Sequence, residues 1–124
     1  MITIVALLKR RADVSLEEFC DYYERHHAPL FQRSIPPEVA DVIVRYVQHH
    51  ALQLGSGTTE PAYDCVTEIG FADLAGVRRW SDWYLGEGGA ILRDDEERFM
   101  DPRQRVVIVT EEHDLGVTPP EVGR

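Results

Sequence analysis

The sequence has few cysteines, and it has no apolar segment long enough to cross a membrane. Its only cysteines are Cys20 and Cys65, and they form no CxxC motif. This excludes a disulfide-rich secreted scaffold and a cysteine-based zinc site, and two free thiols favour the reducing cytoplasm. The apolar stretch at residues 2–8 is far shorter than the about 20 residues that a membrane span needs, and it lacks the basic region of a signal peptide.

Basic residues are also scarce. The chain carries 13 Lys and Arg against 22 Asp and Glu, for a formal net charge of −9 and a pI near 4.9. Lys9 is the single lysine. Nucleic acids and anionic membranes require a basic surface, so neither is expected as a partner. The length fits one domain, which we expect at residues 1–115, followed by a flexible tail at residues 116–124.

Residues 15–27 have the pattern of an amphipathic helix. Ser15 and Glu18 can form a capping box at its start. An apolar stripe at helical spacing follows, formed by Leu16, Phe19, Cys20, Tyr23 and His27. Pro29 disfavours helical geometry at the residue before it, so the predicted helix ends at about His27. His27 would then point inward at a helix C-terminus, where an imidazole can exchange protons near neutral pH.

The rest of the sequence alternates strands and helices. Apolar and β-branched patterns predict strands at about residues 2–8, 42–52, 64–71 and 105–110. A second helical region starts at Asp73, is interrupted by glycines at positions 86, 88 and 89, and ends before Pro102. The order β-α-β-β-α-β predicts an α+β ferredoxin-like fold with an antiparallel sheet. The first and last strands are apolar on both faces, so we expect a homodimer whose two sheets pack face to face.

This hypothesis places a cavity on the sheet face that looks away from the helices. If Ile69 and Phe71 lie under the helices, Asp64 and Glu68 point into that cavity. We assign to the same cavity three polar residues of the neighbouring strand, Tyr46, Gln48 and His50. A buried Glu68 needs a partner, and a His–Glu pair beside an apolar pocket suits general acid–base catalysis. The alternative is an ion pair that only fixes the register of the strands.

The candidate residues fall into two groups. The candidate catalytic residues are His27, His50 and Glu68. The candidate ligand-binding residues are Tyr23, Tyr46, Gln48, Asp64, Trp80 and Phe99. Aromatic residues at helical spacing are more often core than binding surface, but as a cavity wall they suit an aromatic or hydrophobic ligand.

Other chemistry has less support. His26-His27 and His49-His50 could each give one ligand to a metal that Glu68 also binds, but no HxxxH or HExxH spacing supports such a site. The chain also lacks GxSxG, Walker and GxGxxG motifs. We therefore expect no metal and no cofactor.

Several segments together resemble the EthD family of the dimeric α+β barrel superfamily. They are Leu7-Leu8-Lys9-Arg10-Arg11, Ser15-Leu16-Glu17-Glu18-Phe19, Tyr22-Tyr23, His27-Ala28-Pro29-Leu30, Arg45 to His50, Tyr63-Asp64, Glu68, Asp95-Glu96, Phe99 and Val109 to His113. The resemblance covers about residues 2–114, and the His27-Ala28-Pro29 segment is its most specific part. The chain departs from the family in its long Gly55–Pro61 loop and in having Tyr23 where tryptophan is frequent.

The resemblance implies a homodimeric ferredoxin-like barrel, with His27, His50 and Glu68 at the positions of the family's two histidines and acid. The family's founding association is with ether degradation beside a cytochrome P450 system. Similar barrels act as polyketide cyclases, dehydratases, muconolactone isomerases and small monooxygenases.

We therefore expect a cytoplasmic protein that binds a small hydrophobic or aromatic metabolite and catalyses a cofactor-free cyclisation, dehydration or isomerisation. His27 would transfer the proton, and Glu68 or His50 would orient the His27 ring. Tyr46 would donate a hydrogen bond to a carbonyl or enolate. One alternative is a non-catalytic accessory protein that holds an intermediate for an oxygenase. Another is a small monooxygenase, either cofactor-free or haem-assisted.

Overall fold

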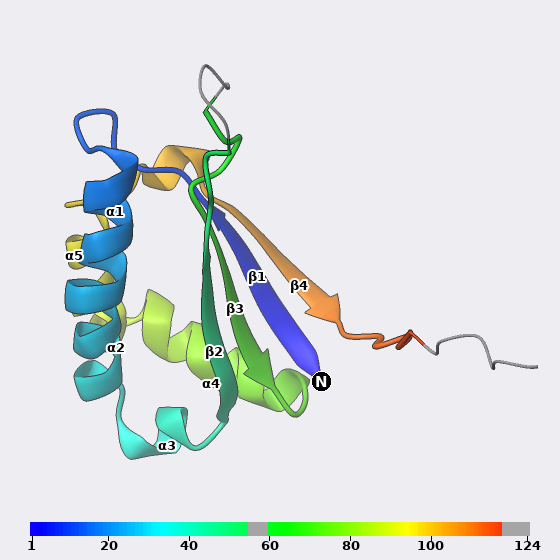
Figure 1. The fold of residues 1–124 in the computed structure, drawn as a ribbon. Coiled ribbons are helices and arrows are strands. Elements are labelled where there is room, and N and C mark those ends of the chain that lie inside the picture. The colour runs from blue at the N-terminus through cyan, green and yellow to red at the C-terminus, as the bar shows by residue number, and fades with distance from the viewer. Residues whose placement is uncertain (55–59, 118–124) are drawn as a thin grey trace, which may run out of the picture.

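A four-stranded antiparallel sheet with helices on one face forms the body of the molecule (Figure 1). The computed structural model describes residues 1–54 and 60–117. The strands are β1 (Ile2–Leu8), β2 (Ile43–His50), β3 (Cys65–Phe71) and β4 (Val106–Glu111), in the spatial order β2-β3-β1-β4. Every neighbouring pair is antiparallel. The predicted α+β ferredoxin-like fold is confirmed.

Two helical regions connect the strands. The first consists of α1 (Leu16–Tyr22), the π-helical turn η1 (Tyr23–His27), α2 (Ala28–Ser34) and the short α3 (Pro37–Ala40). The second consists of α4 (Leu74–Leu85), the 3₁₀ turn η2 (Glu87–Gly89) and α5 (Ala90–Glu96), and a further 3₁₀ turn, η3 (Pro102–Gln104), precedes β4. None of the helices within the described ranges has the length and apolar character of a membrane span.

The first helical region begins where the sequence predicts but extends beyond its predicted end. Ser15 and Glu18 form both hydrogen bonds of the capping box. The predicted end at His27 is wrong, because the chain passes through η1 directly into α2. In this wider turn the N–H of Ala28 donates to the carbonyl of Tyr23, five residues back, and Pro29, which has no N–H, sits in the first turn of α2. His27 therefore lies in the middle of a continuous helical arm.

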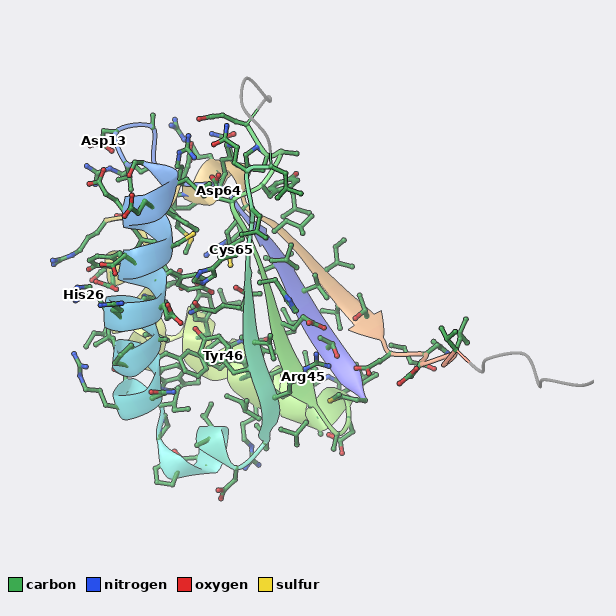
Figure 2. All side chains as sticks on the ribbon, viewed as in Figure 1. Asp13, His26, Arg45, Tyr46, Asp64 and Cys65 are labelled. Atoms are coloured by element: carbon green, nitrogen blue, oxygen red, sulfur yellow. The ribbon has the colours of Figure 1, made fainter. Side chains whose placement is uncertain are left out.

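The pairing of β2 with β3 decides which side chains face the helices. The register shifts between Ile43 and Arg45, so Val44 is an extra residue on β2. Beyond the shift, Tyr46 pairs with Ile69, which is in the core. Tyr46 consequently points toward the helices and Arg45 points to the opposite side of the sheet (Figure 2).

The expectation that Tyr46, Gln48 and His50 share a cavity with Glu68 is wrong. In the observed register Gln48 and His50 pair with Thr67 and Cys65 and lie on the helix face with Tyr46. Glu68 pairs with Val47 and lies on the other face, which we call the outer face. The period of two correctly groups the residues within each strand, but the relation between the two strands depends on the bulge at Val44.

The outer face and β4 leave apolar side chains uncovered in the single chain. Along β4, Val106, Val107, Ile108 and Val109 are between 38% and 54% exposed. The β-branched run predicts a strand covered on both faces, and this chain alone does not provide that cover. Val106 and Ile108 lie on the outer face, and Val107 and Val109 on the helix face. Uncovered apolar side chains on the outer face are typical of an interaction site.

Two predicted flexible segments are only partly described. Of the predicted Gly55–Pro61 loop, positions 55–59 lie outside the described residues. The same holds for positions 118–124 of the predicted tail, whereas Val117 is described and is 96% exposed.

Candidate functional site

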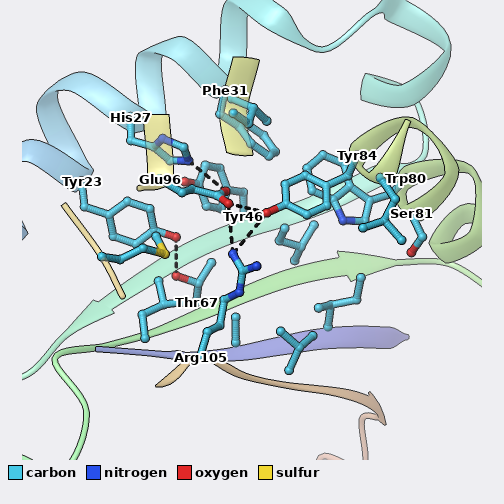
Figure 3. A pocket seen from close by; sticks show the side chains of 18 residues that line it. Tyr23, His27, Phe31, Tyr46, Thr67, Trp80, Ser81, Tyr84, Glu96 and Arg105 are labelled. Carbon is cyan, nitrogen blue, oxygen red and sulfur yellow. Dashed lines mark hydrogen bonds and ion pairs between the residues drawn. The ribbon is translucent and has the colours of Figure 1, made fainter. Parts of the chain in front are cut away.

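A cavity of about 320 Å³ lies between the helix face of the sheet and the surrounding helices (Figure 3). Its walls are mostly apolar and aromatic, and include Ile4, Leu8, Phe31, Ile69, Trp80 and Leu92. The volume is at the lower end of the about 300–1,000 Å³ usual for ligand pockets. The cavity therefore suits a small hydrophobic ligand.

His27 reaches this cavity from η1, with one ring nitrogen held from behind. Its Nδ1 lies 2.8 Å from Oδ2 of Asp95, and its side chain is 4% exposed. A carboxylate only accepts hydrogen bonds, so Nδ1 carries the proton of this contact. Asp95 is itself held by the hydroxyl of Tyr22, which donates to Oδ1 at 2.6 Å. This arrangement fixes both the orientation and the tautomer of the imidazole.

Glu96 faces the other nitrogen of the same ring. Its Oε2 lies 3.5 Å from Nε2 of His27, and its Oε1 accepts from Nη1 of Arg105 at 3.0 Å and from the hydroxyl of Tyr84 (Figure 3). Burial and the adjacent Glu96 raise the pKa of Tyr84, so this phenol remains a neutral donor. The nearly buried carboxylate thus has a cation and a hydroxyl as partners, as a buried charge requires.

Aromatic and hydroxyl groups complete the surroundings of His27. The Tyr23 hydroxyl is 2.6 Å from Oγ1 of Thr67, and burial raises the pKa of Tyr23 well above its ordinary value. Phe99 lies behind the imidazole, with ring centroids 5.2 Å apart. These contacts restrict His27 to a small range of positions.

A second, more polar hollow lies beside the cavity. It is lined by Glu24, Ala28, Gln32, Tyr46, Val47, Gln48 and His50. Tyr46 lines both spaces and separates them. The hollow holds a chain of hydrogen bonds from His50 through Gln48 to Tyr46.

The structure brings together four of the predicted residues and separates others. Tyr23, His27, Tyr46 and Trp80 line the cavity. Gln48 and His50 lie in the adjacent hollow, and Phe99 is core behind His27.

Asp64 and Glu68 lie away from this cavity. Asp64 is fully buried and binds the backbone N–H of Arg10 at 2.7 Å and Nη1 of the same residue at 3.2 Å, so it anchors the start of β3. Glu68 lies on the outer face, 2.5 Å from Nε2 of His49 and 3.4 Å from Nη2 of Arg45. The expectation that Glu68 or His50 orients His27 is wrong, because Asp95 occupies that position.

Four residues of the His27 surroundings were not among the sequence-based candidates: Tyr84, Glu96 and Arg105, which line the cavity, and Asp95, which contacts His27 from behind. Asp95 and Glu96 follow Leu92 and precede Phe99 at helical spacing, so two acids stand within an apolar stripe. That pattern was a usable signal for a buried acidic pair. Nothing local in the sequence marks Arg105, which enters the cavity just before β4. Across the described part of the chain, no three His, Cys, Asp or Glu side chains gather as metal ligands.

Comparison with solved structures supports the fold. An ethyl tert-butyl ether d (EthD) family protein from Bacillus halodurans is 20% identical with a TM-score of 0.62, and the match covers 91% of this chain and 99% of that one. An EthD-like protein from Ralstonia eutropha is 13% identical with a TM-score of 0.62, covering 89% and 90%. A protein from Bacteroides fragilis, described as dimeric, of unknown function and with a ferredoxin-like fold, is 18% identical with a TM-score of 0.52, covering 90% and 95%.

Comparison of the sequence itself is more specific. A search of curated proteins finds no match. Residues 11–103 match the EthD domain, and this segment contains His27, Asp95 and Glu96. It makes up well over half of the chain. The protein therefore belongs to the EthD family.

Proposed function

We propose that the protein binds a small hydrophobic or aromatic metabolite in the cavity and catalyses a cofactor-free proton transfer, with His27 as the acid–base residue. The observation that carries this proposal is the orientation of one imidazole between Asp95 and the cavity. A general base must be held within hydrogen-bond reach of the proton that it takes, and correct placement contributes about 10²–10⁴-fold to the rate. Cyclisation, dehydration and isomerisation are the reactions that such a site can perform.

The two carboxylates have different roles in this proposal. Asp95 orients the ring and stabilises the imidazolium that forms when Nε2 takes a proton, as the third member of a catalytic triad does. Glu96, 3.5 Å from Nε2, is close enough to exchange a proton with the ring or with the ligand. Because Arg105 and Tyr84 bind its other oxygen, Glu96 keeps a fixed position during the exchange.

The proposal includes a homodimer in which the outer faces of two sheets pack together. Val106 and Ile108, the exposed apolar side chains of β4 on the outer face, support it, as does the related Bacteroides structure that is described as dimeric. Two free cysteines, one of them buried, suit a reducing compartment, and we propose the cytoplasm.

The test starts from the ligand that the protein retains. Native mass spectrometry of the purified protein identifies a copurifying ligand, and nuclear magnetic resonance in D₂O then follows exchange of its C–H protons. We expect the wild type to exchange or convert the ligand, and His27→Ala to bind it within about threefold of wild type but to lose the exchange. Full exchange by a folded His27→Ala variant would contradict the proposal.

A non-catalytic binding role is the second candidate, favoured by the largely apolar lining of the cavity. In that case the ligand is recovered unchanged from D₂O, and His27→Ala weakens its affinity. Oxygen consumption on addition of the ligand, or a Soret band in the purified protein, would instead indicate a monooxygenase.

A further inference from the structure

Gln48 is the centre of a small network that joins three parts of the site. Its Nε2 donates to the backbone carbonyl of Tyr23 in η1 at 3.2 Å and to the hydroxyl oxygen of Tyr46 at 3.0 Å. Its Oε1 lies 2.8 Å from Nε2 of His50. One side chain on β2 thus contacts the π-helical turn that carries His27, the cavity wall and the adjacent hollow.

The chemistry of these partners fixes where each hydrogen lies. The carbonyl of Tyr23 can only accept, so the amide nitrogen of Gln48 must face it and the amide cannot be flipped. Oε1 then faces His50, and because Oε1 only accepts, Nε2 of His50 carries a hydrogen. Both N–H groups of Gln48 are used, one on Tyr23 and one on Tyr46.

This assignment makes the Tyr46 oxygen an acceptor toward Gln48, so its own O–H must point elsewhere. Burial raises the pKa of Tyr46, while the hydrogen bonds of Gln48 and Tyr23 act in the opposite direction, as expected for groups that donate to its oxygen. Tyr46 consequently remains a protonated phenol, and its ring lines the cavity. Gln48 lines the hollow and not the cavity, so its hydrogen bond occupies the hollow side of the Tyr46 oxygen and leaves the cavity side for the O–H.

We propose that the ligand is an enolisable carbonyl compound or a phenol, and that Tyr46, turned toward the cavity by Gln48, donates a hydrogen bond to its oxygen as that oxygen becomes anionic. This inference rests on the proposed function and specifies its substrate class. Gln48 is a positioning residue in it, and His50 supports Gln48 from the far side.

Arg105 supplies positive charge from the β4 edge of the sheet, opposite the β2 edge that carries Tyr46. Its Nη1 contacts Glu96 and Tyr84, whereas its Nε and Nη2 atoms form no hydrogen bond among the described residues. The side chain lines the cavity and is 25% exposed. The cavity has a base on the helices, a phenol on the edge strand β2 and a guanidinium just before the other edge strand, β4. This arrangement matches a reaction in which a proton leaves carbon and charge collects on oxygen.

The chemical step balances without a further reactant. Nε2 of His27 takes a proton from the carbon next to the carbonyl, the C–H electron pair forms a C=C bond, and the carbonyl π pair moves onto oxygen to give an enolate. Where the ligand has a C=C bond between its β and γ carbons, the enolate is a dienolate, and return of the proton to the γ carbon moves the C=C bond and re-forms the carbonyl, which is an isomerisation. Alternatively, the enolate re-forms the carbonyl and expels a β-hydroxyl group, which leaves as water after taking the proton from the imidazolium.

The experiment uses 2-naphthol, whose ionised form has a distinct absorption and fluorescence, and naphthalene as the probe without an oxygen. Wild-type protein should bind naphtholate more tightly than naphthalene. Tyr46→Phe should weaken naphtholate binding about tenfold, the value of a hydrogen bond to a charged group, and change naphthalene binding less than twofold.

Gln48→Glu tests the orientation. A carboxylate only accepts, so it would draw the Tyr46 hydrogen away from the cavity. We expect Gln48→Glu to weaken naphtholate binding at least tenfold. In a Tyr46→Phe background the same substitution should have a smaller effect, because Gln48 and Tyr46 act as one unit. The control is Gln53→Glu, the same change at an exposed position that lines neither the cavity nor the hollow, which should alter binding less than twofold.

The outcomes separate this inference from the proposed function. Naphtholate binding no tighter than naphthalene binding, no binding of either probe, or unchanged binding in a folded Tyr46→Phe variant would each overturn the oxyanion assignment. Additive effects of Gln48→Glu and Tyr46→Phe would overturn the positioning role of Gln48. Proton exchange retained by His27→Ala would contradict the proposed function and leave the naphthol result standing.

Discussion

Two histidine–carboxylate clusters among the described residues lie on opposite faces of the sheet. The inner cluster joins His27 to Asp95 and Glu96 beside an apolar cavity, and the His27 side chain is 4% exposed. The outer cluster joins His49 to Glu68 at 2.5 Å, and the His49 side chain is 52% exposed. The shorter contact belongs to the outer pair, whose two residues line neither the cavity nor the hollow. The inner cluster is the candidate catalytic site because it borders a cavity of ligand size, and not because of the length of its contact.

The two clusters also differ in what holds them. The inner residues come from helical elements and are fixed by further hydrogen bonds from Tyr22 and Tyr84. The outer residues sit on neighbouring strands, where cross-strand ion pairs typically stabilise a sheet by about 0.2–1 kcal/mol. We therefore assign the outer cluster a role in strand pairing and the inner one a role in proton transfer.

The largest expected effect comes from removing the charge of one carboxylate in each cluster. Asp95→Asn would lose the acceptor that orients His27, and we expect turnover of the identified ligand to fall roughly a thousandfold. Glu68→Gln should change turnover less than twofold. Equal losses in the two variants, measured by steady-state kinetics, would break the distinction between the clusters.

The outer face can be tested through assembly. Ile108, paired with Val5 on the outer side of the sheet, and Ile91 on α5 are both 49% exposed. If the outer face packs against a second copy, Ile108→Arg would bury an unpaired charge and raise the dimer dissociation constant about a hundredfold. Ile91→Arg is the matched control and should leave it unchanged. Analytical ultracentrifugation distinguishes the two, and a wild-type monomer at micromolar concentration would argue against the dimer.

Stability should also separate the clusters. Arg105→Met leaves the nearly buried Glu96 without its cation, and we expect the free energy of unfolding to fall by about 2 kcal/mol, less than for a fully buried pair because Arg105 is partly exposed. Arg45→Met removes a partner of Glu68 that is more exposed in the single chain, and a loss of about 0.5 kcal/mol is expected for the unfolding of the monomer. Urea denaturation measures both values, and similar losses would contradict the distinction.

The smallest effect concerns alkaline pH. Burial raises the pKa of Tyr23 in the folded protein above its ordinary value of 10.0. Above pH 10 the unfolded state therefore releases this proton while the folded state retains it, so stability decreases as pH rises, by at most about 1.4 kcal/mol per pH unit. Tyr23→Phe should reduce this slope in denaturation curves measured from pH 9 upward. An unchanged slope would mean that Tyr23 ionises equally in both states.

The sequence predicts the fold well because the fold depends on local patterns. The capping box at Ser15, the alternation in Cys65–Phe71 and the β-branched run in β4 each specify an element directly. The inward direction of His27 also follows from helical spacing. The end of its helix could not be predicted in this way, because a π-helical turn accommodates Pro29 and the helical arm continues.

The composition of the site was harder to derive, because it depends on register and on contacts between distant segments. Period two groups Tyr46, Gln48 and His50, but only the shift at Val44 tells which face they occupy. Asp95 lies 68 residues from His27 in the sequence, and their pairing follows from the way α5 packs beside η1. Glu68 was a reasonable candidate because it does pair with a histidine, although with His49 on the other face.

The single extra residue at Val44 lets both Ile43 and Tyr46 face the helices. These two residues are three positions apart, and regular alternation along a strand would place them on opposite faces. If the same residues paired without the bulge and Ile43 kept its place, Arg45, Val47 and His49 would face the helices instead. Deleting Val44 would remove the bulge and leave Tyr46, Gln48 and His50 on the helix face, so the strand can lose this residue without exchanging the side chains that it presents to the cavity and the hollow.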